Sequence, residues 1–172
     1  MGCILNCVIC ASLLAQPSMT TLTPPVSIVE PMEVPDVASS FKAWMDYRTI
    51  TDKASVQYEM QQEATTDDNG MRVYKDMYMI ALGTYYATSC GEMFYITFDT
   101  DETIKCVVGD IKNDAHTDES NRYIEINGNV AEFIVDRKKI SDKVKRTGDI
   151  SNADDKFKGE IVKIEKINID NT

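Results

Sequence analysis

The sequence predicts a mainly β protein, and two observations carry that prediction. Residues 92–98 and 103–108 are short apolar segments with two-residue alternation, and the polar turn 99–102 between them makes a β-hairpin. Strands do not alternate with long amphipathic helices, so the rhythm of βαβ units is missing. We therefore expect a mixed, mainly β barrel with one or two short helices.

The other elements are expected from local signals in chain order. Residues 41–50 are apolar and aromatic, and the latter half of this segment, 45–49, is an expected strand. Asp52 is a suitable N-cap for a helix over 53–63, and residues 65–70 have the composition of a turn. The elements expected after that turn are strands at 71–74, 123–126 and 130–135, a short helix at 137–146 with its basic residues outward, and a last strand at 159–167.

Length and charge limit the possible functions. The chain has 172 residues, which suits one domain and a tail, and 43% of them are apolar, enough for a core. The net charge of −10 repels nucleic acid phosphates and anionic lipid headgroups. We therefore expect no nucleic acid partner and no electrostatic attachment to a membrane, and the apolar segment 3–15 is too short for a stable membrane span. A neutral sugar polymer remains compatible, because sugars are bound by hydrogen bonds and stacking.

The N-terminal region suggests export through an atypical signal. Residues 3–15 are apolar and have the length of a signal peptide, although no Lys or Arg precedes them. The alternative to an exported protein is a cytoplasmic protein with a disordered apolar tail. Residues 16–40 contain all five prolines and are an expected linker, so the folded domain is expected over 41–169.

The cysteines leave two alternatives open. Cys3, Cys7 and Cys10 lie at the N-terminus, whereas Cys90 and Cys106 lie in the body of the chain. A disulfide between Cys90 and Cys106 and two buried free thiols are both compatible with the sequence. No pair of CxxC motifs is present, so we expect no metal site and no cofactor.

Three carboxylates are candidate functional groups. Glu132 stands inside the apolar segment 130–135, beside Phe133 and Ile134, which could desolvate it. Asp110 follows a glycine at the end of a strand, and Asp76 precedes a turn-like segment. The alternatives are structural: a solvated sheet face for Glu132, a loop position for Asp110 and a cap on backbone amides for Asp76.

A second group of residues could contact a substrate. His116 is the only histidine and has acids two residues away on each side, Asp114 and Asp118. Tyr85 and Tyr86, like Trp44 and Tyr47 nearer the N-terminus, could stack on sugar rings. A polar loop around His116 and core packing of the tyrosines are the alternative roles.

Three segments resemble one family of bacterial cell-wall proteins. They are Asp76 with the Leu82-Gly83 pair, Val107-Val108-Gly109-Asp110, and Val130-Ala131-Glu132 with its apolar continuation. Their order and spacing resemble the three-aspartate (3D) domain over residues 71–136, and more loosely over 44–167, in a Firmicutes and phage subgroup. Two family prolines are replaced by Met77 and Ala81, and the third acid is Glu132 rather than aspartate.

The resemblance implies both a fold and an activity. The fold would be the six-stranded double-psi β-barrel shared with rare lipoprotein A, expansins and MltA-type lytic transglycosylases. The function would be peptidoglycan cleavage by a monomer, with Glu132 as the first choice of general acid and base, then Asp110 and Asp76. The alternatives are a non-catalytic carbohydrate-binding module and a phage or wall-associated accessory module.

Overall fold

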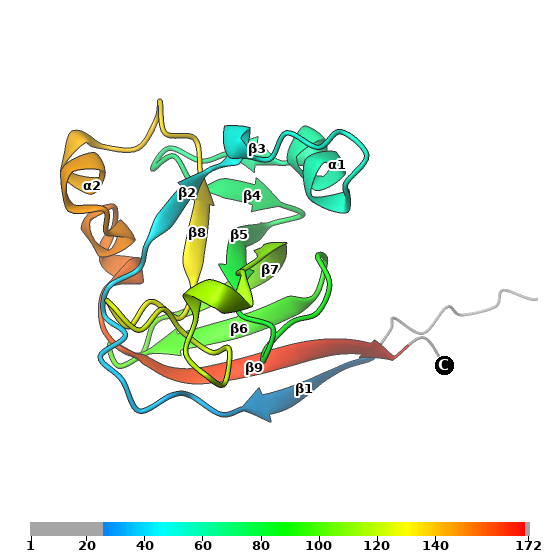
Figure 1. Ribbon diagram of the computed structural model, residues 1–172, viewed down its shortest axis with the longest axis vertical. Coiled ribbons are helices and arrows are strands. Elements are labelled where there is room, and N and C mark those ends of the chain that lie inside the picture. Colours follow the sequence, from blue (N-terminus) through cyan, green and yellow to red (C-terminus); the bar gives the residue numbers. More distant parts are fainter. Residues whose placement is uncertain (1–25, 171–172) are drawn as a thin grey trace, which may run out of the picture.

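The computed structural model describes residues 26–170 and is built around one mixed β-sheet (Figure 1). Nine strands occur in this described range, and they run in the order β1-β9-β6-β7-β5-β4-β3, with β8 joining β5 to β2. The mainly β class is confirmed. The described strands form an unclosed sheet, whereas the expectation was a closed barrel of six. The strands are β1 Val26–Met32, β2 Trp44–Asp46, β3 Thr65–Thr66, β4 Arg72–Tyr74, β5 Met77–Leu82, β6 Met93–Phe98, β7 Thr103–Ile111, β8 Glu132–Val135 and β9 Ile161–Asp170.

Two strands are inserted between earlier strands of the chain. Strand β7 lies between β5 and β6, parallel to β5 and antiparallel to β6. Strand β8 lies between β2 and β5, parallel to β2 and antiparallel to β5. The carboxyl ends of β5 and β7 and the amino end of β8 therefore meet at one edge of the sheet. The loops that follow β5 and β7 leave from that edge.

The two faces of the sheet carry separate apolar clusters. Ile80, Leu82 and Val108 point into the main core, which Phe133 and Val135 of β8 complete. Because side chains alternate along a strand, the intervening residues point to the other face. There they form a smaller cluster, here called the methionine cluster, which consists of Met60, Met77, Met79, Val107 and Ile134. Helix α1, Val56–Glu63, covers this second face through Met60.

Both helices begin later than the sequence suggested. Helix α1 starts after Ser55, whose Oγ accepts a hydrogen bond from the Tyr58 amide. Asp52 instead accepts from the Ala54 amide and closes the preceding turn. Helix α2, Asp142–Thr147, starts after Ser141 and ends at Gly148, whose φ of 72° suits glycine. The short 3-10 turns of the described chain are Tyr47–Thr49, Asp114–His116, Ile150–Asn152 and Asp155–Phe157.

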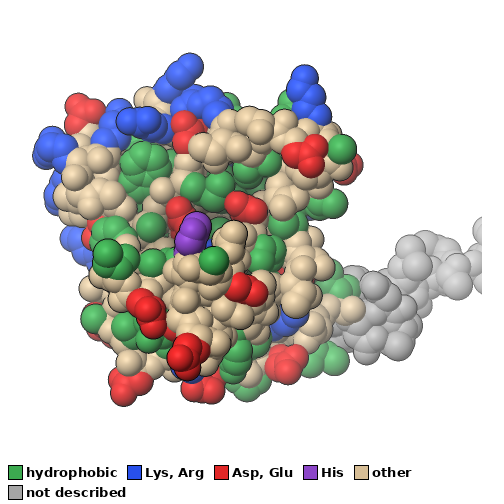
Figure 2. All heavy atoms as spheres, viewed as in Figure 1, with side chains coloured by type: hydrophobic (Ala, Val, Ile, Leu, Met, Phe, Trp, Pro, Cys, Tyr) green, Lys and Arg blue, Asp and Glu red, His purple; other side chains and the backbone are tan. Residues whose placement is uncertain are grey.

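The basic residues of the expected helix 137–146 do point outward. Arg137, Lys138, Lys139, Lys143 and Lys145 are exposed in the structure. Figure 2 shows Lys and Arg side chains gathered at the corner where Figure 1 places α2. Positive charge is thus concentrated locally on a chain whose net charge is −10.

Strand β1 lies inside the range expected to be a linker. It pairs antiparallel with β9 along its whole length, from Val26 opposite Asp170 to Met32 opposite Ile164. The folded part therefore begins well before residue 41. The expected signal-like segment, residues 1–15, lies outside the described residues, as do Cys3, Cys7 and Cys10.

The expected strand at 123–126 does not form. The backbone there makes only an isolated bridge, between Ile124 and Asn129. The segment is a loop in which Tyr123 packs against the core and Ile126 is 92% exposed. No helix of the described chain is long and apolar enough to cross a membrane.

Both cysteines of the described chain are free thiols. Cys106 is fully buried in the main core, and Cys90 is half-buried near Asp110. Burial raises the pKa of the Cys106 thiol. Burial, helped by the charges of Asp110 and Glu92, raises the pKa of the Cys90 thiol to about 11. In this structure the second alternative, two free thiols, applies.

Candidate functional site

Asp110 and Glu132 lie on the two strands that flank β5. In β7, Asp110 is in register with Ala81, and in β8, Glu132 is in register with the same alanine from the other side. Paired residues of neighbouring strands point to the same face of a sheet. The two carboxylates and the Ala81 methyl group therefore form one row across three strands. Their strands are two sheet spacings apart, about 10 Å.

A β-bulge at Gly109 turns Asp110 onto this face. The register passes from Ile80 opposite Val108 directly to Ala81 opposite Asp110, so Gly109 is the extra residue. Without the bulge, strict alternation would point Asp110 into the main core together with Val108. A Cβ at position 109 would lie 2.8 Å from the end of the Met79 side chain, which explains why a glycine is suited to this place.

Lys112 is a buried cation beside Glu132. Its Nζ donates to the backbone carbonyls of Asn129, at 2.7 Å, and Val130, at 2.9 Å. These carbonyls belong to the chain just before β8, which begins at Glu132. Desolvation lowers the pKa of Lys112 to about 8, and the negative charge of Glu132 opposes that shift. The ammonium is therefore held in place by neutral carbonyls and by attraction to Glu132.

The pKa of the Glu132 carboxyl group is shifted by its surroundings. Burial raises the pKa of Glu132, the charge of Lys112 lowers it, and the charge of Asp110 raises it, with a net rise. Its carboxylate accepts no hydrogen bond from the described part of the chain, so no donor stabilises the anion directly. A half-buried glutamate with a raised pKa keeps its proton to a higher pH than an exposed one, which suits a general acid.

Asp110 also lines an open cleft. The cleft measures about 330 Å³ and lies between the β2–α1 connection and the sheet. Apart from Asp110 it is lined by Met45, Thr49, Ile50, Thr51, Asp52, Ser55 and Gln57. Asp110 Oδ1 accepts a hydrogen bond from the Ile111 amide at 2.9 Å, which fixes the carboxylate at the cleft wall. Glu132 is not among the residues that line this cleft.

Asp76 is not part of this group. It lies with Lys75 in the tight turn between β4 and β5, where both residues have positive φ, 62° and 48°. It is exposed and stands at the opposite end of β5 from Ala81. Five residues of extended strand separate Asp76 from Ala81, about 16 Å. The structure therefore brings together two of the three candidate carboxylates.

The histidine segment lies in the loop after β7, at the same edge of the sheet. His116 is exposed and ends the 3-10 turn Asp114–His116. Asp114 accepts a hydrogen bond from Thr84 at 2.7 Å, which ties this loop to the one after β5. In Figure 2 the histidine, coloured purple, has acidic side chains on both sides of it.

Asp118 has a structural role in that loop. It is buried and accepts hydrogen bonds from the amides of Arg122, at 2.6 Å, and Tyr123, at 3.0 Å. Burial raises the pKa of Asp118. These backbone donors and the Arg122 charge lower the pKa by a larger amount, so the net shift is downward. Its carboxylate thus stabilises the turn rather than facing solvent.

The two candidate tyrosines have different environments. Tyr86 is 2% exposed and donates a hydrogen bond from its hydroxyl to the Glu33 carbonyl, so it belongs to the core. Tyr85 is 40% exposed and packs edge-on against Tyr86, with ring centroids 5.0 Å apart. Of the two rings, Tyr85 is the one that a ligand could reach.

Lys112 was not predicted from the sequence as a site residue. It lies within the polar segment 109–121, and nothing local distinguishes it from a solvated loop lysine. Its burial depends on strand β8, which is brought beside β5 from a distant part of the chain. The one weak signal is its position two residues after Asp110, which the alternation of a continuing strand would place on the same face.

No protein family, curated protein or solved structure matches this chain. Within the described residues, no group of three or more His, Cys, Asp or Glu side chains is arranged to hold a metal ion. The chemistry open to the site therefore depends on Asp110, Lys112 and Glu132 themselves. Together they form a carboxylate pair with a buried cation, an arrangement that suits proton transfer.

Proposed function

We propose that this protein cleaves the glycan strands of peptidoglycan, as a lytic transglycosylase or a related glycan-cleaving enzyme, with Glu132 as general acid and base. One observation carries the proposal: Glu132 is half-buried, has a raised pKa and lies in register with Asp110 across Ala81. The resemblance of the carboxylate segments to 3D-domain proteins supplies the substrate class.

A single carboxyl group can perform both proton transfers of this reaction. Protonated Glu132 would donate its proton to the glycosidic oxygen while the bond from that oxygen to the anomeric carbon breaks. The resulting carboxylate would then take the proton of the muramic acid 6-hydroxyl as its oxygen attacks the anomeric carbon. A 1,6-anhydro ring forms, no water is consumed, and Glu132 returns to its protonated state.

The neighbours of Glu132 have defined parts in this scheme. The negative charge of Asp110 favours protonated Glu132 before the reaction and would stabilise positive charge that develops at the anomeric carbon. The Lys112 ammonium acts in the opposite direction and keeps Glu132 from becoming too weak an acid. The two opposing charges adjust the proton affinity of Glu132 to its task.

The strand order supports a double-psi arrangement as part of the proposal. Two strand insertions support this proposal: β7 lies between β5 and β6, and β8 lies between β2 and β5. Strands β1, β3 and β4 would then be additions to that central unit. Secretion to the cell wall, suggested by the N-terminal sequence, belongs to the same proposal.

The activity can be tested on purified peptidoglycan. Incubation should lower its turbidity, and mass spectrometry should detect 1,6-anhydromuropeptides. Glu132→Gln should reduce the rate by at least about 100-fold, because the amide cannot donate the proton. Asp76→Asn removes a carboxylate at the far end of β5 and should leave the rate unchanged. Intact peptidoglycan with the wild-type protein would refute the proposal.

A non-catalytic wall-binding module is the second candidate, and one observation favours it. The open cleft is lined by Asp110 but not by Glu132, so a glycan bound there would meet only one of the two acids. Retention of the protein on peptidoglycan in a pull-down, without soluble products, would support this candidate. A cytosolic protein with reduced cysteines would instead support an intracellular accessory role.

A further inference from the structure

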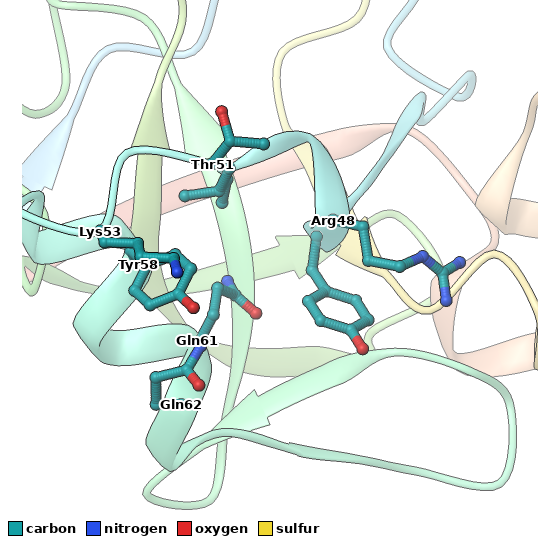
Figure 3. Close-up of a pocket in the computed structure, with 8 residues that line it drawn as sticks. Arg48, Thr51, Lys53, Tyr58, Gln61 and Gln62 are labelled. Atoms are coloured by element: carbon teal, nitrogen blue, oxygen red, sulfur yellow. The ribbon is translucent and has the colours of Figure 1, made fainter.

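A second cavity of about 330 Å³ lies between helix α1 and the segment that follows β2 (Figure 3). It is lined by Tyr47, Arg48, Ile50, Thr51, Lys53, Tyr58, Gln61 and Gln62. Ile50 and Thr51 also line the cleft that contains Asp110. The two hollows are therefore neighbours that share one wall, and a chain-like ligand could occupy both.

Aromatic rings from two different elements line this cavity. Tyr47 comes from the turn after β2, and the Arg72 guanidinium lies 4.4 Å from the centroid of its ring. This contact restrains the Tyr47 ring. Tyr58 comes from the first half of α1. The Arg48 guanidinium also lies 5.3 Å from the centroid of the Tyr47 ring, so two cations already contact that ring, and Tyr58 provides the stacking surface for one ring of a ligand.

Some polar groups of the cavity already form hydrogen bonds within the protein, and others are available to a ligand. Gln61 is buried, and its Oε1 accepts a hydrogen bond from Arg72 Nε at 2.9 Å, so it is part of the framework. The side chains of Thr51 and Gln62 are exposed and form no hydrogen bond with the described residues. Figure 3 shows Thr51 above the space between α1 and the segment that carries Arg48. A hydroxyl and a primary amide are thus free to bind a polar ligand.

One cation of the cavity is available to a ligand, and the other is occupied. Arg48 donates to Asp46, at 2.8 Å, and to Asp136, at 3.1 Å, and Figure 3 shows its guanidinium directed away from Tyr58 and Gln61. Lys53 is exposed and forms no ion pair within the described part of the chain. Lys53 is therefore the group that can attract an anionic substituent.

We propose that this cavity is a binding subsite for an N-acylated sugar ring whose lactyl carboxyl group is free of a stem peptide, next to the cleft that Asp110 lines. Tyr58 would hold the ring, Thr51 and Gln62 would bind its hydroxyl and acyl groups, and Lys53 would pair with the carboxylate. The inference rests on the proposed function for the identity of the glycan. It adds a site at which the glycan chain is bound, and it adds the Lys53 charge, which selects an acidic sugar.

The test measures binding in the absence of cleavage, with full-length protein carrying Glu132→Gln. Calorimetry would use two probes, the disaccharide of N-acetylglucosamine and N-acetylmuramic acid, and di-N-acetylchitobiose, which has no carboxylate. Tyr58→Ala should weaken both by about tenfold, because a stacking surface is lost. Lys53→Gln should weaken only the acidic probe, by about threefold. Val56→Ala, exposed on the same helix and outside the cavity, is the matched control and should change neither affinity.

The outcomes separate this inference from the proposed function. If the wild-type enzyme cleaves peptidoglycan but Tyr58→Ala leaves both affinities unchanged, the subsite is refuted and the activity stands. If no cleavage occurs but Tyr58-dependent binding persists, the activity is refuted and the subsite stands. Equal weakening of both probes by Lys53→Gln would refute selection of the carboxylate.

Discussion

Asp110 and Glu132 stand in register on opposite sides of strand β5, with only the methyl group of Ala81 between them in their row. A larger side chain at position 81 would fill the space over which the two carboxylates interact. Both acids come from strands that are distant along the chain, so the row exists only in the folded protein.

The pKa of Glu132 should respond in opposite directions to changes at its two charged neighbours. Asp110→Asn removes a repelling negative charge and should lower the pKa of Glu132, whereas Lys112→Met removes an attracting cation and should raise it further. Carbon-detected NMR titration of the Glu132 side chain measures both shifts without any substrate. A titration curve that stays the same in both variants would show that the three groups do not interact.

Glu132→Gln should stabilise the folded protein at neutral pH. Burial raises the folded-state pKa of Glu132 above its unfolded value. The stability associated with the protonated form is therefore fully present below the unfolded pKa and is lost as pH rises through the folded pKa. Urea unfolding from pH 3 to 8 should show a gain for the variant that disappears at the acidic end. A variant that is less stable than wild type at pH 7 would contradict this.

Gly83→Ala should destabilise the protein by more than about 3 kcal/mol. A Cβ at position 83 would overlap the backbone carbonyl of Asn121, which cannot move without displacing the loop after β7. Gly91→Ala is the matched control, because a Cβ there meets open space and only its positive φ of 95° disfavours alanine, by about 1 kcal/mol. Thermal unfolding of both variants measures the contrast, and similar melting temperatures would refute the packing argument.

The two cysteines of the folded part should differ in reactivity. At pH 8, Cys90 should alkylate slowly, because burial raises its thiol pKa to about 11, and its rate should increase steadily toward alkaline pH. Cys106 should react only after unfolding, since it is fully buried. Peptide mass mapping after timed labelling with iodoacetamide distinguishes them. Labelling of Cys106 in native protein at the rate of Cys90 would contradict the structure.

Local sequence patterns predicted much of the sheet but less of the site. The hairpin of β6 and β7 follows from alternation and an intervening polar turn, and the structure has both strands. Glu132 was singled out because an acid inside an apolar segment is unusual. The role of Lys112 could not be predicted, because its burial depends on which strands lie beside β5, whereas the distance of Asp76 follows from the extended strand Met77–Leu82 that separates it from Ala81.

Strand β1 illustrates a different limit of sequence reasoning. The proline content of residues 16–40 is typical of a linker. Within this range, however, Pro31 lies opposite Glu165 in a regular pair of strands. Proline is tolerated there because β1 is at the edge of the sheet and needs no hydrogen bond on its outer side. Whether such a segment is a strand depends on β9, which follows it by more than a hundred residues.

The pairing of Val26 with Asp170 places the two ends of the described chain side by side. A short Gly- and Ser-rich connection between these strands would join them without crossing the molecule, and the chain could be opened instead at the exposed loop around Ile126. Such a circular permutant would begin near strand β8, so that Glu132 and Lys112 would come from opposite ends of the new chain. If the chain were cut at the same loop without joining its ends, Lys112 and Glu132 would lie on two separately expressed fragments. Recovery of the site on mixing these fragments would report directly on folding.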